Sequence, residues 1–397
     1  MVNADQNRCI ACLAEGVQVF LEIPQAPVLC NLPADSPQEA LRTPRRDIQL
    51  AFCPSCGHVF NLAFQADLVK YGEEYENSLF FSPFFQAEIQ ALADELIERY
   101  RLHGKRIVEI GCGQGDFLKL LVAKGRNTGI GFDPAYVRTP GDSFADSRLE
   151  FIRDYYSNQY VVTRVDFLFS RRVLEHIADP RAFLAMVHRS MGSGSRTAVF
   201  FEVPNGLFML RDLSVWDILY EYRSYFTAHS LARLLTETGF QVCRVAEAYA
   251  GQFLRVEAIP ASAPQGGSVD TEDTLAQMQG YVERLADHYR ARVEKWREIG
   301  RAASADGRSI AVWGGGSKGV TFVNKMRDDV AVEFVIDVNP RKWGKYLTGT
   351  GHQIVPPVHL AQMCPDIVIV MNPIYETEIR ATLRELEIDA QPELMIA

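Results

Sequence analysis

Two stretches of the chain alternate short apolar runs with segments of helical periodicity, and this alternation strongly constrains the fold. In the first stretch the apolar runs are 106–110, 128–132, 165–170 and 197–203, with helical patterns at 116–124, 181–190 and 229–238. In the second stretch the runs are 309–314, 332–337 and 366–371, and the series closes at the end of the sequence. Strands that alternate with helices indicate parallel sheets with crossover helices. The predicted fold class is therefore α/β, with two doubly wound domains.

Three domains are expected, because 397 residues exceed what one hydrophobic core usually supports. Residues 1–75 form a first region that is rich in proline and cysteine and has no long helical period. Residues 76–262 form the first α/β domain, which opens with an amphipathic helix at 83–103. Residues 263–397 begin in a linker rich in proline, glycine and serine, and continue through a long charged helix, 274–301, into the second α/β domain. We expect this helix to connect the domains.

Charge and hydropathy exclude several classes of protein. The net charge of −9 argues against a nucleic-acid partner, which normally requires a basic face. No apolar run reaches about 18 residues, and the chain starts without an apolar segment after a basic one. We therefore expect a cytoplasmic protein without a membrane partner, and the sequence leaves the oligomeric state open.

Two C-x-x-C pairs dominate the first region. Cys9 and Cys12 form one pair, and Cys53 and Cys56 the other. In a cytosolic chain such pairs are typical of a tetrahedral zinc site that is closed by four thiolates and supports folding. Unligated cysteines or a redox pair are the alternatives. Cys30 is expected to be buried and not to bind the metal.

A glycine loop follows the strand 106–110, with Glu109 at the strand end and then Gly111, Gly113 and Gly115. Alternate glycines let a ligand lie against the backbone, and this loop resembles motif I of class I methyltransferases. Its G-x-G-x-G spacing differs from the G-x-G-x-x-G of dinucleotide sites, and the later segment SRRVLEHIADP is typical of methyltransferases. The loop therefore predicts a site for S-adenosylmethionine (SAM).

Two carboxylates complete this predicted site. Asp133 ends the next strand, where an acidic side chain accepts hydrogen bonds from ribose hydroxyls. Asp154 follows the third strand, where such enzymes often contact adenine. The alternative for both is a solvated carboxylate at a strand end.

The whole chain resembles the three-domain sugar C-methyltransferases of deoxysugar biosynthesis. The segments that carry the resemblance, beside the cysteine pairs, are 75–85, 108–118, 173–180, 220–226 and 313–324. The resemblance implies a zinc-binding domain, a SAM-dependent class I methyltransferase domain and a C-terminal Rossmann-like domain. It also implies a nucleotide-linked keto-sugar as substrate, held between the second and third domains and methylated through an enolate.

The family's general base does not match this sequence. In the family the base is the histidine of a Tyr-x-Glu-His segment, whereas here the segment reads Leu219-Tyr220-Glu221-Tyr222. A tyrosine with a pKa near 10 is a poor base unless its phenolate is stabilised. We therefore predict that Glu221, assisted by His176, takes the proton, and that Tyr222 and Tyr75 orient the substrate.

A second glycine loop, 314–319, opens the third domain and matches G-x-G-x-x-G. An NAD site would show the same loop, with Asp337 ending the next strand. By resemblance we prefer the pyrophosphate of a sugar nucleotide, bound by the amide of Gly316 and by Ser317 and Lys318, with Asn339 and Arg341 nearby. A Rossmann domain without ligand is the third possibility.

Two other functions stay open at this point. The same scaffold with an altered base can methylate oxygen or nitrogen of a related small natural-product precursor. A non-catalytic zinc-ribbon interaction protein is disfavoured by the retained Glu109, glycines and Asp133.

Overall fold

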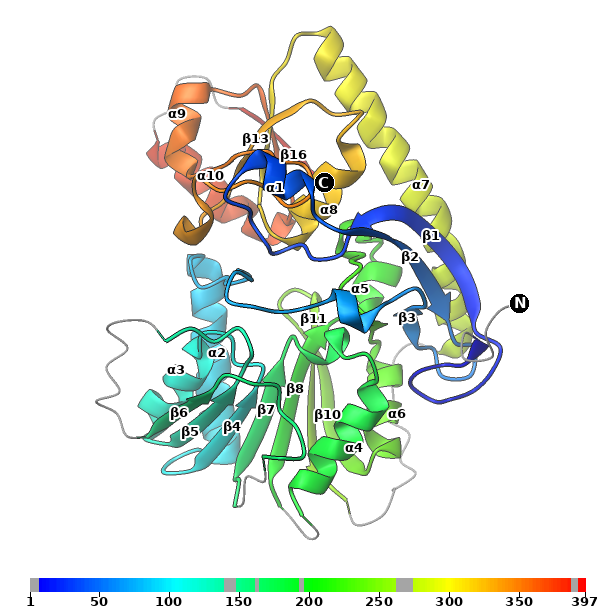
Figure 1. The fold of residues 1–397 in the computed structure, drawn as a ribbon, viewed down its shortest axis with the longest axis vertical. Coiled ribbons are helices and arrows are strands. Elements are labelled where there is room, and N and C mark those ends of the chain that lie inside the picture. Colours follow the sequence, from blue (N-terminus) through cyan, green and yellow to red (C-terminus); the bar gives the residue numbers. More distant parts are fainter. Residues whose placement is uncertain (1–6, 139–147, 161–163, 193–195, 262–273, 387–391) are drawn as a thin grey trace.

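The structure is a computed structural model that describes residues 7–138, 148–160, 164–192, 196–261, 274–386 and 392–397. Two α/β domains lie at opposite ends of the molecule, and the long helix α7 (Leu275–Ala305) runs beside the N-terminal strands (Figure 1). The predicted linker lies outside the described residues from 262 to 273.

The central domain contains a seven-stranded sheet in the order β10-β11-β8-β7-β4-β5-β6. Its strands are β4 (Arg106–Ile110), β5 (Thr128–Phe132), β6 (Leu149–Ile152), β7 (Phe167–Arg171), β8 (Ala198–Pro204), β10 (Phe240–Ala248) and β11 (Phe253–Pro260). Its helices are α2 (Pro83–Tyr100), α3 (Asp116–Gly125), α4 (Pro180–Ser190), α5 (Gly206–Leu210) and α6 (Ala228–Glu237). The α/β prediction is confirmed, with one difference. Strand β11 is antiparallel to both neighbours, because the short 249–252 connection forms a hairpin and is too short for a crossover.

The C-terminal domain has a five-stranded parallel sheet in the order β14-β13-β12-β15-β16. Its strands are β12 (Ile310–Trp313), β13 (Val332–Ile336), β14 (Ile354–Val355), β15 (Ile367–Val370) and β16 (Glu393–Ile396). Helices α8 (Ser317–Met326), α9 (Leu360–Met363) and α10 (Glu376–Glu385) complete it. The strand order reverses at β12, and the carboxyl ends of strands at such a point form a crevice where ligands bind.

The N-terminal region contributes β1 (Gln18–Pro27), β2 (Arg45–Phe52) and β3 (Val59–Asn61), an antiparallel sheet with the short helix α1 (Pro37–Leu41). The fourth strand of this sheet, β9 (Ser224–Tyr225), comes from the central domain. The N-terminal region is therefore joined to the central domain by backbone hydrogen bonds.

Helix α7 is part of the hydrophobic core as well as a connection. Met278 and Trp296 on its buried face belong to one apolar cluster with Ile48 of β2 and Phe322 of α8. This cluster joins the N-terminal sheet to the C-terminal domain. Among the residues that the structure describes, no helix is both long and apolar enough to cross a membrane.

Candidate functional site

The four predicted metal ligands converge. The sulfur atoms of Cys9, Cys12, Cys53 and Cys56 all lie within 4.8 Å of one another, and the Cys9–Cys56 and Cys12–Cys53 pairs are 3.6 Å apart. Four thiolates at ~2.3 Å from one Zn²⁺ would be spaced by about 3.8 Å, so the cluster fits a structural zinc. Cys30 lies elsewhere in the molecule and is buried.

The cysteine cluster packs against the central domain. Arg233 of α6 donates a hydrogen bond to the carbonyl oxygen of Ser55, and Arg181 of α4 donates one to the carbonyl oxygen of Ala11. Both acceptors lie between the cysteines of a pair, so the two pairs hold the N-terminal region on these helices.

A cavity of about 500 Å³ lies in the central domain, beyond the carboxyl ends of β4 and β5. We call it the central-domain cavity. It is lined by Glu109, Gly111, Gly113, Asp133 and Asp154, as the sequence predicts for one site. Its volume is that of a typical small-molecule pocket.

The three glycines of the first glycine loop differ in the space beside their Cα atoms. All have positive φ angles, 73° at Gly111, 54° at Gly113 and 78° at Gly115. A Cβ added at Gly111 would approach Val173 to 2.1 Å, and one at Gly115 would approach Phe151 to 2.3 Å. A Cβ at Gly113 meets no protein atom within 4 Å. Gly113 therefore leaves space for a ligand, whereas Gly115 is not on the cavity wall and turns the chain into α3.

Two carboxyl groups of this cavity, Asp133 and Glu109, differ in burial and in their partners. Asp133 accepts hydrogen bonds from the amides of Gly113 (2.7 Å) and Ala135 (2.8 Å), so it also fixes the glycine loop. Burial raises its pKa. Glu109 is more deeply buried, its Oε2 has no hydrogen-bond partner among the described residues, and burial raises its pKa well above the usual range.

A second cavity, of about 250 Å³, lies between the central and C-terminal domains. We call it the interdomain cavity. All four predicted catalytic residues line it. Glu221 and Tyr222 line this cavity alone, whereas Tyr75 and His176 line both cavities. The residues common to both walls are Tyr75, Asn77, Ser78, Leu79, Arg172 and His176. The two cavities therefore meet at these side chains.

Glu221 is completely buried beside this junction. Its Oε2 accepts a hydrogen bond from the Tyr75 hydroxyl (2.9 Å), and its Oε1 accepts one from the amide of Cys30 (3.4 Å). Burial raises the pKa of Glu221 to about 7, although both hydrogen bonds oppose the shift. Such a carboxyl group can take up or release a proton near neutral pH.

His176 stands next to Glu221 and is held by two oxygens. Its Nδ1 lies 2.6 Å from the Tyr71 hydroxyl and 3.1 Å from the carbonyl oxygen of Glu221. Burial lowers the pKa of His176 to about 4, so the imidazole is neutral at physiological pH.

Tyr222 packs edge-on against His176, with ring centroids 5.1 Å apart. Burial raises the pKa of its phenol well above the usual value, and the nearby carboxylates of Glu175 and Glu221 raise it further. Nothing here stabilises a phenolate, so Tyr222 is not suited to act as a base.

The second glycine loop forms part of the interdomain cavity through Gly316, Ser317 and Lys318. Ser317 begins α8, whose first amides have no side-chain cap. Lys318 forms an ion pair with Asp217 of the central domain. Asp337 accepts hydrogen bonds from the amides of Gly315 (3.0 Å) and Asn339 (2.8 Å) and pairs with Lys342, so its carboxylate is bound within its own domain.

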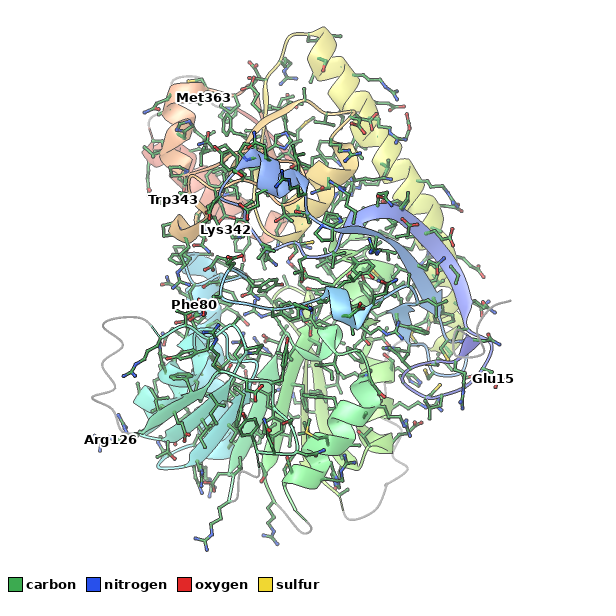
Figure 2. The ribbon with its side chains drawn as sticks, in the orientation of Figure 1. Glu15, Phe80, Arg126, Lys342, Trp343 and Met363 are labelled. Carbon is green, nitrogen blue, oxygen red and sulfur yellow. The ribbon has the colours of Figure 1, made fainter. Side chains whose placement is uncertain are left out.

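Asn339 and Arg341 are not among the residues that line the interdomain cavity. The Asn339 amide donates a hydrogen bond to Glu76 (3.0 Å), and Arg341 pairs with the same carboxylate at 3.3 Å. Figure 2 shows Lys342, which follows Arg341, and Phe80, which precedes α2, on the edges of the two domains that face each other. The side chains of Asn339 and Arg341 therefore hold the segment around Glu76, between the N-terminal region and α2. Arg341 lines the central-domain cavity and not the interdomain cavity.

Three cavity residues were not predicted from the sequence. Asn31 donates hydrogen bonds to Ser317 Oγ (2.9 Å) and to the Tyr75 hydroxyl (3.3 Å), and so connects the second glycine loop with the partner of Glu221. Arg172 lines both cavities with a positive φ of 57°, which is a strained backbone for arginine. Glu175 is buried in the interdomain wall. Arg172 and Glu175 belong to SRRVLEHIADP, the segment typical of methyltransferases, so the sequence could have marked them as site residues. Asn31 lies in a stretch without any recognisable motif.

Comparison with known proteins agrees with this arrangement. Residues 85–245 match a family model described as a methyltransferase domain, and residues 267–391 match one described as a C-methyltransferase C-terminal domain. The chain is 28% identical over 309 residues to the C-methyltransferase NovU of Streptomyces niveus, an alignment that covers 73% of this chain and 72% of NovU.

Solved structures give weaker similarities. Magnesium protoporphyrin IX methyltransferase (ChlM) from Synechocystis PCC 6803, with bound SAH, is 16% identical and has a TM-score of 0.35, covering 45% of this chain and 84% of ChlM. A SAM-dependent methyltransferase from Mesorhizobium loti is 17% identical with a TM-score of 0.33, covering 43% of this chain and 99% of that protein. The assignment rests on the two family models and on NovU. The chain is therefore a SAM-dependent methyltransferase, and its C-terminal part matches the C-terminal domain of C-methyltransferases.

Proposed function

We propose that this C-methyltransferase acts on a nucleotide-linked keto-deoxysugar, with SAM in the central-domain cavity and the sugar in the interdomain cavity. The observation that carries the proposal is the junction of the two cavities at Tyr75 and His176, with the buried Glu221 beside it. A sugar at this junction has its reacting carbon between a proton acceptor and a methyl donor, which is the geometry that a methyl transfer requires.

The residues of this chain account for the proton step. The Glu221 carboxylate accepts the acidic proton from the carbon next to the keto group, and the C–H electron pair moves into the enolate. SAM, when bound, supplies an electrophilic methyl carbon, and its sulfur leaves as a neutral thioether. Tyr75 keeps Glu221 in place through its hydroxyl, and the neutral His176, which lines both cavities next to Glu221, assists the proton transfer.

Glu109, Gly111, Gly113, Asp133 and Asp154 are the residues that would hold SAM. The unpartnered Oε2 of Glu109 and the open space beside Gly113 fit a ligand with polar groups lying against the loop. Gly115 supports this site by turning the chain into α3.

Substitutions in the first glycine loop are expected to weaken SAM binding. Gly113→Val places a branched side chain in the central-domain cavity, so we expect affinity to fall at least about tenfold. Asp133→Ala removes an acceptor of ribose hydroxyls and the anchor of the loop, and we expect a loss of about 100-fold. Calorimetric titration with SAM measures both. Gly104→Val is the matched control, because Gly104 also has a positive φ (63°) and open space but lies away from the cavity. Unchanged affinity in both variants would place SAM elsewhere.

The second glycine loop is proposed to bind the pyrophosphate of the sugar nucleotide. The uncapped N-terminus of α8, Ser317 and Lys318 offer donors to an anion at the interdomain cavity. Asp337, which would bind a ribose in an NAD site, forms an ion pair with the buried Lys342, a partner that Asp133 beside the first loop does not have among the described residues. This arrangement favours the sugar nucleotide over NAD.

Charge substitutions at this loop test the pyrophosphate site. Lys318→Ala is expected to weaken binding of the nucleoside diphosphate TDP by about tenfold or more. Asp217→Asn removes the carboxylate that competes for Lys318, so TDP should bind more tightly. Calorimetry with TDP and with NAD measures these effects. Tight NAD binding that is lost in Gly316→Val would reverse the choice of ligand.

The position of the new methyl group decides between this proposal and the alternative, methylation of oxygen or nitrogen. Incubation with ¹³C-methyl-labelled SAM and a panel of TDP-linked keto-deoxyhexoses is expected to give a product whose labelled methyl is bonded to carbon. NMR reads this bond directly. A methyl on oxygen or nitrogen, or no product with any keto-sugar, would overturn the proposed substrate and mechanism.

A further inference from the structure

Glu175 is a buried carboxyl group that receives no hydrogen bond from the side chains that the structure describes. It lies in the one-turn segment Leu174–His176 between β7 and α4, and its side chain is 1% exposed. Neither carboxyl oxygen has a hydrogen-bond partner among the described residues. By contrast, the equally buried Glu202 is held by Arg171 and Arg255. Because an unpaired buried carboxyl group is destabilising, Glu175 calls for an explanation beyond stability.

Its position points to the reaction. Glu175 lines the interdomain cavity, and its Oε1 lies 3.8 Å from Nε2 of His176, one of the residues common to both cavities. Its carbonyl oxygen accepts a hydrogen bond from the amide of Arg223 (2.8 Å), which fixes it beside the Glu221 segment. Two acidic side chains thus lie in one wall of the proposed sugar site.

The two carboxyl groups suit different protonation states. Burial raises the pKa of Glu175 to about 8. The backbone amide of Glu175 itself and the charge of Arg172 oppose this shift, and the charges of Glu202 and Glu221 add to it. Glu221 has its lower value of about 7 because it receives hydrogen bonds from Tyr75 and Cys30. When two nearby carboxyl groups share one charge, the better hydrogen-bonded one carries it. Glu221 is then the base, and Glu175 keeps its proton.

We propose that Glu175 is a further catalytic residue, whose carboxyl O–H donates a hydrogen bond to the keto oxygen of the substrate as the enolate forms. This inference rests on the proposed function. Glu221 takes the proton from carbon, the C–H pair becomes the C=C bond, and the carbonyl π pair moves to the oxygen that Glu175 contacts. The enolate pair then forms the new C–CH₃ bond, the S–CH₃ pair stays on sulfur, and Glu221 later releases its proton to water.

The chemistry requires such a donor. Negative charge develops on the keto oxygen, and a neutral acid in a site without water stabilises an enolate more than the ground-state ketone. One donor of this kind is typically worth 10²–10³-fold in turnover, as a rough scale.

Two variants of Glu175 separate donation from other roles. Glu175→Gln keeps an N–H donor of similar shape, and Glu175→Leu keeps the volume but has no donor. With a TDP-linked keto-deoxyhexose in D₂O, we measure exchange of the carbon-bound proton without SAM, and methyl transfer with SAM. We expect Glu175→Leu to lose about 100-fold in both rates and Glu175→Gln to lose about tenfold or less. SAM affinity should stay near that of the wild type in both variants, and the thermal midpoint of Glu175→Leu should not fall below that of the wild type.

The outcomes separate this proposal from the proposed function. Wild-type rates in Glu175→Leu would show that Glu175 is not a donor. Equal inactivity of Glu175→Gln and Glu175→Leu would show that the carboxylate itself is needed, and would also overturn the proposal. If the wild type neither exchanges the proton nor methylates carbon, the proposed function fails before any Glu175 variant is considered, and the inference fails with it.

Discussion

Glu221→Gln is expected to lower turnover by about 100-fold or more, with little change in SAM affinity. The amide keeps the shape and can still meet the Tyr75 hydroxyl, but it cannot accept a proton from carbon. The pH profile gives a second readout. Because burial holds the pKa of Glu221 at about 7, the carboxylate form, and with it kcat/KM, should rise as pH increases through about 7. This rise should disappear in the variant.

Tyr222→Phe tests the alternative that Tyr222, and not Glu221, is the general base. The phenol of Tyr222 has a pKa raised far from neutrality. We therefore expect loss of this hydroxyl to change substrate orientation and to lower turnover less than Glu221→Gln does. Steady-state rates over a range of pH, with both variants made in parallel, measure the difference. An inactive Tyr222→Phe beside an active Glu221→Gln would make the tyrosine the base.

Loss of one thiolate from the cysteine cluster is expected to remove the metal and destabilise the whole chain. The purified protein should hold about one zinc, and Cys53→Ser should hold much less. Structural zinc contributes several kcal/mol or more to folding, so we expect the thermal midpoint to fall by about 10 °C or more. Metal analysis and thermal unfolding measure the two effects. Treatment of the wild type with a strong chelator should reproduce the destabilisation.

Cys243→Ser is the control for this experiment, because Cys243 is exposed on β10 and is not part of the cysteine cluster. It should retain both zinc and stability. A folded wild type that contains no zinc, or a Cys53→Ser variant that unfolds like the wild type, would contradict the zinc assignment.

The contacts of the N-terminal region explain why its stability should matter for activity. One end of the region packs on α4 and α6 through the cysteine pairs. The other end shares a hydrophobic core with α7 and the C-terminal domain and carries Asn31, which contacts both Ser317 and Tyr75. Loosening of this region should therefore disturb the interdomain cavity as well as the metal site.

Local patterns in the sequence were sufficient for much of the architecture. The apolar runs became β4, β5, β7 and β8, and the helical patterns became α3, α4 and α6, because periodicity of burial is a local property. The cysteine pairs were predictable for a similar reason, since the C-x-x-C spacing lets two sulfur atoms bind one metal ion. The first glycine loop and Asp133 were brought to one cavity because neighbouring parallel strands end at the same edge of a sheet.

The tertiary structure decided what the sequence left open about the reacting groups. The partners of Glu221, Tyr75 and the amide of Cys30, are 146 and 191 residues away, and the ion pair of Lys318 with Asp217 spans 101 residues. Asn339 and Arg341 follow the second glycine loop in sequence, yet they contact Glu76. The protonation states of Glu175 and Glu221 depend on how many of their oxygens receive a hydrogen bond once water is excluded. Desolvation of this kind arises only when distant segments pack together, so residue types and spacing alone do not determine it.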